Sequence, residues 1–454
     1  MTNVCMYVQV HQPYRLSAYR VLDIGRRGDY FDEDGNREIV QRIAAKCYLP
    51  ANEVLLRQIE RFQGRFRIAF SISGTALEQF ERHAPQALLS FRDLARTGCV
   101  EFLGETAMHS LAGILDAAEF RRQVDLHLNM TEHWFGRRPT TFRNTELIYN
   151  NDLAATIRQR GFTAMLAEGA ESTLGWRSPD FVYSAPGTPG TTGNTGTIEN
   201  TGNTGNTANA AAPGLSVLLR NYRLSDDIAF RFSNRAWPEW PLTAGKYAQW
   251  INAINGNGQV VNLFMDYETF GEHHWADTGI FDFLAALPGA VLAHPDNRFL
   301  TPAQVAASCP PVGEIDVPGH TSWADQERDL SAWLGNAMQR SAAQALYDLA
   351  EPVHRSGDPR MIRTWRRLTT SDHLYYMSTK RMSDGEVHAY FNPYESPYEA
   401  YIRFMNVLHD LSLRLKETPA SVPGAVPMRT MLSRLQDRAI IDSTRAVEPM
   451  AAAV

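Results

Sequence analysis

Seven short apolar runs, separated by amphipathic stretches, constrain the fold of this 454-residue chain more than any other feature of its sequence. Most of the runs are continuous rather than alternating, which is typical of strands buried on both faces of a parallel sheet. Between them, stretches such as 118–136 place apolar residues at helical spacing. Strand followed by helix, repeated about seven times, predicts an α/β barrel. The predicted strands are 4–10, 66–72, 100–104, 140–146, 163–168, 215–222 and 260–267.

The apolar runs stop after residue 300, and helical spacing takes over. Residues 326–350 place Leu330, Ala337, Ala345 and Leu349 on one side of a predicted helix, and further helices are expected to about residue 415. We therefore predict a catalytic barrel over 1–300 and a mostly helical region over 301–415 that packs on the barrel and completes the cleft. Residues 416–454 are expected to be a partly disordered tail.

Residues 186–214 differ in kind from the rest of the barrel. The segment repeats a Thr-Gly-Asn triplet, contains no aromatic residue and carries one charge. It has too little apolar surface to offset the entropy of ordering. We expect a flexible surface insertion in the loop before the sixth of the seven predicted strands.

Charge and composition exclude several classes of protein. Lys plus Arg minus Asp plus Glu gives 44 − 50 = −6, without a basic run, so neither nucleic acid nor an anionic membrane surface is an expected partner. No segment approaches the ~18 consecutive apolar residues of a membrane span. The first residues, "MTNVCMYVQVHQPYR", lack the pattern of a signal peptide, and we expect a soluble, cytoplasmic protein. Four widely spaced cysteines predict buried free thiols rather than a zinc knuckle or disulfide scaffold.

Polar and ionisable residues follow four of the predicted strands. In an α/β barrel, catalytic groups lie just past the carboxyl ends of different strands. A solvated rim could produce this pattern at one or two strands, whereas four favour an active site. The residues are His11 and Gln12 after the first strand, Glu105 and His109 after the third, Arg143 and Glu146 after the fourth, and Asp266 and Glu268 after the seventh.

Each of these residues also has a structural interpretation. His11 could be a hydrogen-bonded core histidine, Glu105 could cap the next helix, and Glu146 could pair with its neighbour three residues earlier. Asp266 and Glu268 are two apart, so on a strand they would face the same way. Like charges on one face repel, so either one carboxyl is neutral near pH 7 or a cation or substrate lies between them. A raised carboxyl pKa is what a general acid requires.

Five blocks, in order along the chain, resemble glycoside hydrolase family 57 and specifically its α-amylase branch. The blocks are "HQPYR", "GETAMHS", "FRNTELIY", "MDYETFGEHH" and "TTSDHLYYM". The resemblance extends from the first strand to about residue 415. It implies an incomplete, seven-stranded (β/α) barrel with an appended helical region, which agrees with the strand count above.

The resemblance also implies a role for individual residues. Glu146 matches the catalytic nucleophile of the family and Asp266 its general acid/base. His11, Glu105, Glu268 and Asp372 match residues that line the central sugar subsite, and His273, Trp275 and Tyr375 match residues along the glucan. Arg143 stands in the same substrate-binding region, where some relatives carry an aromatic residue.

The implied activity is retaining hydrolysis of α-1,4-glucosidic bonds in starch, glycogen or malto-oligosaccharides. Glu146 would attack the anomeric carbon while Asp266 protonates the departing oxygen, and Asp266 would then deprotonate a water. This double displacement needs no metal and no cofactor. The expected partner is the α-glucan itself, and the sequence does not indicate an oligomeric state.

Three other functions remain open on the sequence. A 4-α-glucanotransferase or glucan-branching enzyme would use the same fold with a sugar acceptor. A metal-dependent carbohydrate deacetylase or zinc mannosidase would use His11, Asp266 and a further histidine as ligands, but Pro13 stands where such families usually carry Asp or His. A non-catalytic glucan-binding protein would not need Glu146 and Asp266.

Overall fold

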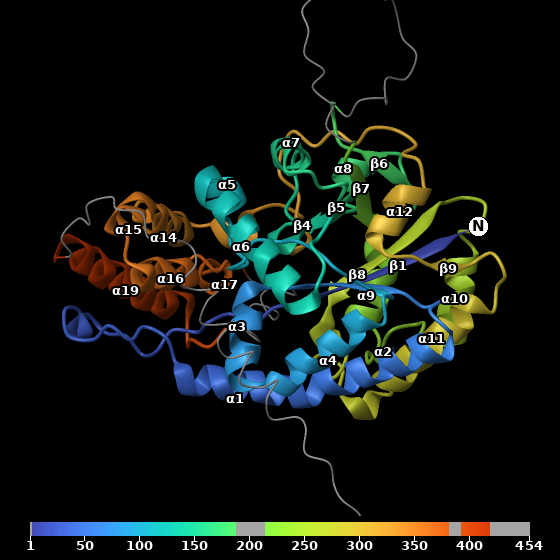
Figure 1. Ribbon diagram of the computed structural model, residues 1–454, viewed down its shortest axis with the longest axis horizontal. Helices are drawn as coiled ribbons and strands as arrows, with labels where there is room; N and C mark the ends of the chain where they lie inside the picture. The colour runs from blue at the N-terminus through green and yellow to red at the C-terminus, as the bar shows by residue number, and fades with distance from the viewer. Residues whose placement is uncertain (1, 188–213, 381–391, 418–454) are drawn as a thin grey trace, which may run out of the picture.

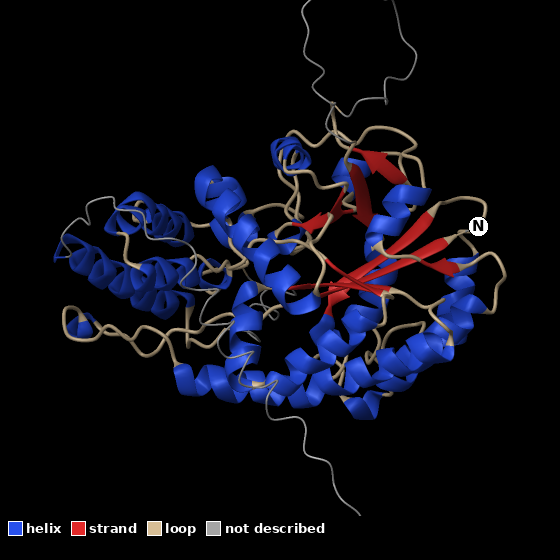
Figure 2. Ribbon diagram, in the orientation of Figure 1, coloured by secondary structure: helices blue, strands red, loops and turns tan. Residues whose placement is uncertain are grey.

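The computed structural model describes residues 2–187, 214–380 and 392–417. Its strands lie together in one half of the molecule, and a group of C-terminal helices lies in the other half (Figures 1 and 2). The predicted insertion at 186–214 and the predicted tail at 416–454 lie outside the described residues, except for their ends. The predicted domain boundary near residue 300 stays a prediction.

All seven predicted strands are present. They are β1 (Asn3–Val10), β2 (Ile68–Ile72), β3 (Val100–Phe102), β4 (Thr141–Arg143), β5 (Ala164–Glu168), β7 (Ser216–Arg220) and β8 (Val260–Asp266). Two short strands were not predicted: β6 (Val182–Ser184), which runs antiparallel to β7, and β9 (Arg298–Phe299), which pairs with β1. The seven predicted strands form only parallel pairs with one another.

The strands form two sheets rather than one closed barrel sheet. One sheet has the order β3-β2-β1-β8, and the other has the order β4-β5-β7-β6. Backbone hydrogen bonds join the sheets at two places. At the first, the Gly104 N–H donates to the Thr141 carbonyl (2.9 Å) and the Gly104 carbonyl accepts from the Arg143 N–H (2.8 Å). At the second, the Asn221 N–H donates to the Asn262 carbonyl (2.9 Å). Because β3 and β4 have only three residues each, their contact is reduced to an isolated bridge. The expected parallel α/β fold is confirmed, but a continuous barrel sheet is not observed.

An apolar interior lies between the two sheets. Its residues come from strands of both, including Tyr7 of β1, Ala69 of β2, Leu166 of β5, Leu218 of β7 and Phe264 of β8. Alternate residues of these strands therefore face inward, as the two-residue period of a strand requires. The interior is a packed core, and functional groups can gather only at its ends.

Helices cover the outer faces of the sheets. Two of them, α2 (Leu49–Arg61) and α11 (Ile280–Leu292), pack with β1, β2 and β8 in one core. The others in this part of the chain are α1 (Glu33–Ile43), α3 (Gly74–His83), α4 (Pro85–Arg96), α5 (Ala112–Leu115), α6 (Ala117–Phe135), α7 (Asn151–Gln159), α8 (Glu171–Leu174), α9 (Tyr222–Ala229) and α10 (Ala244–Asn252). Helix α6 agrees with the prediction for residues 118–136.

The C-terminal region is helical, as predicted, and shares a core with β4, β5, β7, α6 and α7. Trp333, Trp365 and Phe404 are buried in that core. Its helices are α12 (Pro302–Ser308), α13 (Ser331–Leu334), α14 (Ala337–Tyr347), α15 (Ala350–Ser356), α16 (Pro359–Leu368), α17 (Asp372–Tyr375) and α19 (Pro397–Glu417).

The prediction of one continuous helix over 326–350 is wrong. The segment contains α13, α14 and the start of α15. Asn336 has extended backbone angles, and its side chain accepts a hydrogen bond from the Gln339 N–H (2.9 Å), so a new helix begins there. Apolar spacing continued across this break because both helices bury one side in the same core.

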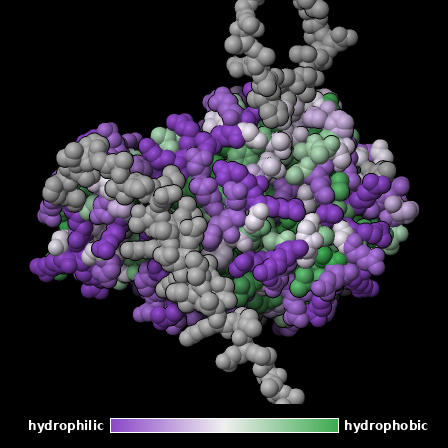
Figure 3. Space-filling model, in the orientation of Figure 1, coloured by the Kyte–Doolittle hydropathy of each residue, from purple (hydrophilic) through white to green (hydrophobic). Residues whose placement is uncertain are grey.

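Two further expectations concern the surface and the cysteines. Hydrophilic residues cover much of the face shown in Figure 3, and among the described residues no helix has the length and apolarity to cross a membrane. Cys5, Cys47, Cys99 and Cys309 are buried and free, as predicted.

Candidate active site

The carboxyl ends of four strands bring the predicted catalytic residues together. His11 follows β1, Glu105 follows β3, Glu146 follows β4 and Asp266 is the last residue of β8. Hydrogen bonds, ion pairs and electrostatic effects connect all four. These four residues thus meet where the strand pattern placed them.

Glu146 has a donor on each carboxylate oxygen. Its Oε1 lies 2.7 Å from Nε2 of His109, and its Oε2 accepts a hydrogen bond of 2.6 Å from the indole N–H of Trp323. Burial alone would raise the pKa of Glu146, but the hydrogen bond and charge of His109 and the charge of Arg143 outweigh it, so that the pKa lies below its usual value. Glu146 is therefore ionised at neutral pH, as a nucleophile must be.

The backbone at Glu146 is left-handed, with φ 56° and ψ 29° in a 3-10 turn over Thr145–Leu147. His109 also has a positive φ, of 50°. Such conformations are uncommon for residues with a side chain, and they persist only where surrounding contacts enforce them. The backbone N–H of Trp323 donates to the backbone carbonyl of Glu146 (3.1 Å) and helps to hold the turn.

His109 bridges two carboxylates. Its Nδ1 lies 3.1 Å from Oε2 of Glu105, while its Nε2 contacts Glu146. Burial alone would lower the pKa of this imidazole. The hydrogen bonds to Glu105 and Glu146 outweigh burial and raise the pKa to about 9. At neutral pH His109 is charged and donates to both carboxylates. Burial also opposes ionisation of Glu105, but His109 keeps the pKa of Glu105 below its usual value.

His11 links the β1 end to the C-terminal helices. Its Nε2 lies 2.8 Å from Oδ2 of Asp372, the first residue of α17, and its Nδ1 lies 2.7 Å from the Ser73 hydroxyl. The His11 and His109 rings are stacked, with centroids 4.0 Å apart. Burial and the charge of His109 lower the pKa of His11, so its ring is neutral, and it donates to Asp372 and accepts from Ser73.

Asp266 and Glu268 both have raised pKa values. Burial, followed by the charge of Glu146, raises the pKa of Asp266 to about 6. Burial and the charge of Asp266 raise the pKa of Glu268 to about 8, although the Tyr48 hydroxyl donates to it and the Gln12 amide lies 3.3 Å away. Glu268 is thus the carboxyl that is neutral near pH 7.

The strand geometry used to predict this coupling is wrong in detail. Strand β8 ends at Asp266, and Glu268 lies in a 3-10 turn over Tyr267–Thr269. The two carboxyls interact because both lie at the strand end, where Glu268 is buried and Asp266 partly buried, not because they face the same way along a strand.

The remaining predicted residues lie at the end of β4, after β8 and in α17. Arg143, at the end of β4, is completely buried. His273 is partly buried, with its pKa lowered to about 4 by burial and by His274. Trp275 is 58% exposed, with the Lys46 ammonium 4.7 Å from its ring centroid. Tyr375, in α17, is partly buried with its ring 6.4 Å from that of Trp333.

The two aromatic residues that donate to Glu146 and Glu268 lay outside the sequence prediction. Trp323 belongs to a loop without helical or strand periodicity, and Tyr48 lies in a π-helical segment (Ala44–Tyr48) far from any strand end. Only their position in space connects them to the site. An aromatic residue with a polar group that can reach a buried carboxylate leaves no signal in the local pattern.

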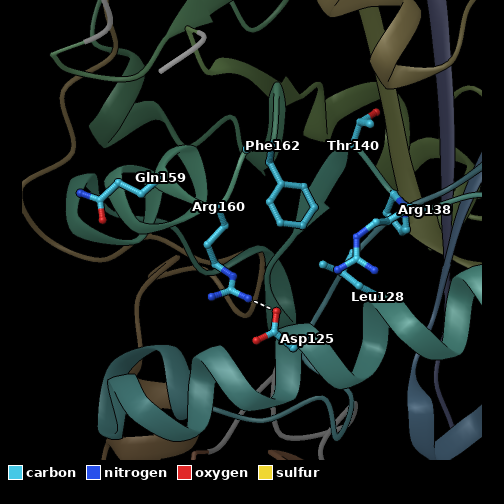
Figure 4. Close-up of a pocket in the computed structure, with 9 residues that line it drawn as sticks. Asp125, Leu128, Arg138, Thr140, Gln159, Arg160 and Phe162 are labelled. Atoms are coloured by element: carbon cyan, nitrogen blue, oxygen red, sulfur yellow. Dashed lines mark hydrogen bonds and ion pairs between the residues drawn. The ribbon is translucent and has the colours of Figure 1, made fainter. Parts of the chain in front are cut away.

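Two other features could have indicated a different site: a group of metal ligands and the pocket shown in Figure 4. Within the described residues, no group of three or more His, Cys, Asp or Glu side chains is arranged to hold a metal ion. The pocket of Figure 4 is lined by Asp125, Arg138, Arg160 and Phe162, among others. It lies before β4 and β5, at the amino ends of these strands, and contains none of the predicted catalytic residues.

Comparison with known proteins gives relatives over nearly the whole chain. A curated protein of Methanocaldococcus jannaschii named "Putative alpha-amylase" is 39% identical over 425 residues, which span 90% of this chain and 84% of the relative.

Solved structures share the fold at much lower identity. A 4-α-glucanotransferase of Thermococcus litoralis has a TM-score of 0.62 at 13% identity, over 90% of this chain and 59% of that one. A family 57 branching enzyme of Thermococcus kodakaraensis has a TM-score of 0.60 at 13% identity (96% and 94% covered). An α-amylase of Thermotoga maritima has a TM-score of 0.53 at 14% identity (93% and 98% covered).

The family that these names suggest is also matched directly. The sequence model described as glycosyl hydrolase family 57 matches residues 5–318, which is well over half of the chain. By this match, and by the 39% identity to its curated relative, the chain belongs to glycosyl hydrolase family 57.

Proposed function

We propose that this enzyme is a retaining α-amylase that hydrolyses α-1,4-glucosidic bonds of starch, glycogen or malto-oligosaccharides. The observation that carries the proposal is the opposite perturbation of two neighbouring carboxyls. The pKa of Glu146 lies below its usual value, whereas that of Asp266 is raised to about 6. Titratable groups pushed apart in this way are typical of an acid and a nucleophile that act together.

Each chemical step then has a residue suited to it. Ionised Glu146 attacks the anomeric carbon and forms a glycosyl-enzyme, and protonated Asp266 donates its proton to the departing oxygen. Asp266, now a carboxylate, removes a proton from the incoming water, and attack by that water releases Glu146. His109 and Trp323 hold the Glu146 carboxylate in place. No step requires a metal or a cofactor.

Other groups are suited to bind the sugar. Neutral Glu268 can donate a hydrogen bond to a sugar hydroxyl, and the His11–Asp372 pair lies beside the stacked His109 ring. Exposed Trp275 offers a flat apolar surface of the kind that packs against a sugar ring. We assign these residues to the glucan-binding cleft. A curated relative with an α-amylase name supports the choice of substrate.

The substitution Glu146→Gln tests the assignment, with maltoheptaose as substrate. The amide is nearly isosteric but cannot attack, so kcat should fall by several orders of magnitude while the fold is retained. Glu132→Gln, on the exposed side of α6, is the control and should keep wild-type activity. Activity of Glu146→Gln within about tenfold of wild type would exclude Glu146 as nucleophile.

The products distinguish hydrolysis from the alternative, 4-α-glucanotransfer or branching. Hydrolysis of maltoheptaose gives shorter products and a rising number of reducing ends. Longer products at a constant number of reducing ends would show that a sugar hydroxyl, rather than water, accepts the glycosyl group.

A further inference from the structure

Arg143 is a buried cation whose side chain makes no hydrogen bond with the described residues. It is the last residue of β4 and its side chain is 0% exposed. Within the described part of the chain, its Nε, Nη1 and Nη2 atoms have no hydrogen-bond partner. Burial of an ionised group is unfavourable unless nearby charges compensate it. Arg143 therefore does not anchor a hydrogen-bond network among the described residues, and its charge acts on its surroundings through electrostatic interactions.

The groups around Arg143 belong to the nucleophile and its partners. The guanidinium carbon lies 4.8 Å from the ring centroid of Trp323, and the indole N–H of Trp323 donates to Glu146. A cation over an aromatic ring is attracted to its face, and this contact holds the indole beside the nucleophile.

Among the described residues, the charge of Arg143 lowers the pKa values of four titratable groups. They are Tyr7 of β1, Glu105 after β3, Glu146 after β4 and Asp266 of β8. Other charges act on the same carboxyls. His109 lowers the pKa values of Glu105, Glu146 and Asp266, His127 lowers that of Glu105, and Arg220 lowers that of Asp266. The charge of Asp266 in turn raises the pKa of Glu268. The guanidinium of Arg220 also lies 5.8 Å from the Trp323 ring centroid.

We propose that Arg143 is a positioning residue whose buried positive charge, rather than a contact with sugar, sets the pH range over which Glu146 is ionised while Asp266 is protonated. The proposal rests on the roles given above to Glu146 and Asp266. Burial raises the pKa values of Glu105, Glu146 and Asp266, and Arg143 is among the charges that oppose this in all three. A side chain without exposed surface cannot reach a sugar unless it moves.

The pH profile of kcat/KM for Arg143→Met tests this role. Met has similar length but no charge, so both limbs of the profile should move to higher pH. Activity is then lost at the acid end, where Glu146 becomes protonated, and is better retained at the alkaline end, where Asp266 keeps its proton. Arg143→Lys restores the charge and should return the profile to its wild-type position. A purely structural role would lower the whole profile without moving it.

Arg160→Met is the matched control. Arg160 is a partly buried arginine that pairs with Asp125 in the pocket of Figure 4, away from the catalytic carboxylates. Its replacement should leave both limbs in place. If Arg143→Met moves neither limb relative to this control, the proposal is wrong. Arg143→Gln provides a second neutral variant if the Met variant does not fold.

Thermal unfolding tests the charge independently of activity. The folded-state pKa values of Glu105 and Glu146 are lowered, so the stability they contribute is present above their ordinary values and is lost as pH falls. The difference in Tm between wild type and Arg143→Met should therefore widen from pH 4 to pH 7. A difference that does not depend on pH would overturn the proposal. Failure of the wild type to hydrolyse maltoheptaose would instead refute the proposed function and leave this test valid.

Discussion

The alkaline limb of the pH profile follows from the environment of Asp266. In the proposed mechanism Asp266 must be protonated in the first step, and burial together with the charge of Glu146 raises its pKa to about 6. Above this pH the protonated fraction falls tenfold per unit, so kcat/KM for maltoheptaose at pH 8 should be roughly 100-fold below its maximum. Glu146 sets the acid limb below the ordinary range of a glutamate, because it must be ionised to attack. Since kcat/KM reports the pKa values of the free enzyme, it is the quantity that tests these two assignments.

A substrate that does not need an acid provides the control. Nitrophenolate departs without protonation, so a nitrophenyl α-glycoside of a malto-oligosaccharide should show a weaker alkaline limb. Asp266→Asn should likewise retain much more activity toward this substrate than toward maltoheptaose. A kcat/KM for maltoheptaose that stays constant from pH 6 to pH 9 would contradict the assignment of Asp266 as the acid.

Two further predictions concern metal and stability. Dialysis against EDTA should leave the rate unchanged, because the proposed steps use only carboxyl groups, and loss of activity that zinc restores would favour the metal-dependent alternative. Glu119→Gln should lower the free energy of unfolding by an amount near the lower end of ~3–5 kcal/mol, because it removes the buried carboxylate that binds Arg366 (2.7 Å) and His354 (2.8 Å), two partners that remain partly exposed. Glu132→Gln on the same helix breaks only an exposed pair with Arg138 and should cost less than about 1 kcal/mol, so equal effects in urea denaturation would contradict this reasoning.

The strands could be predicted because burial on two faces leaves a continuous apolar run. All seven predicted strands exist. The two missed strands are β9, which has only two residues, and β6, which has three residues like β3 and β4 but runs antiparallel at the edge of its sheet. The division into two sheets could not be predicted, since it depends on how many residues β3 and β4 pair across Gly104.

The site was predicted to the extent that its residues follow strands. His11, Glu105, Glu146 and Asp266 occupy the expected strand ends. Trp323 could not be found, because a loop far along the chain brings it to Glu146. The coupling of Asp266 and Glu268 was expected on a strand but arises across a strand end and a 3-10 turn, because the sequence does not mark where β8 stops.

The stereochemistry of the product tests the central claim most directly. If Glu146 is a nucleophile and Asp266 its acid/base partner, their carboxyl groups should lie about 5–5.5 Å apart, and two inversions at the anomeric carbon give net retention. Proton NMR during the first minutes of maltoheptaose hydrolysis, before mutarotation, distinguishes the two anomers. We predict that the α-anomer appears first. Initial release of the β-anomer would mean direct attack by water across a gap of ~6.5–9.5 Å, with Glu146 as a general base, and would contradict the double-displacement mechanism.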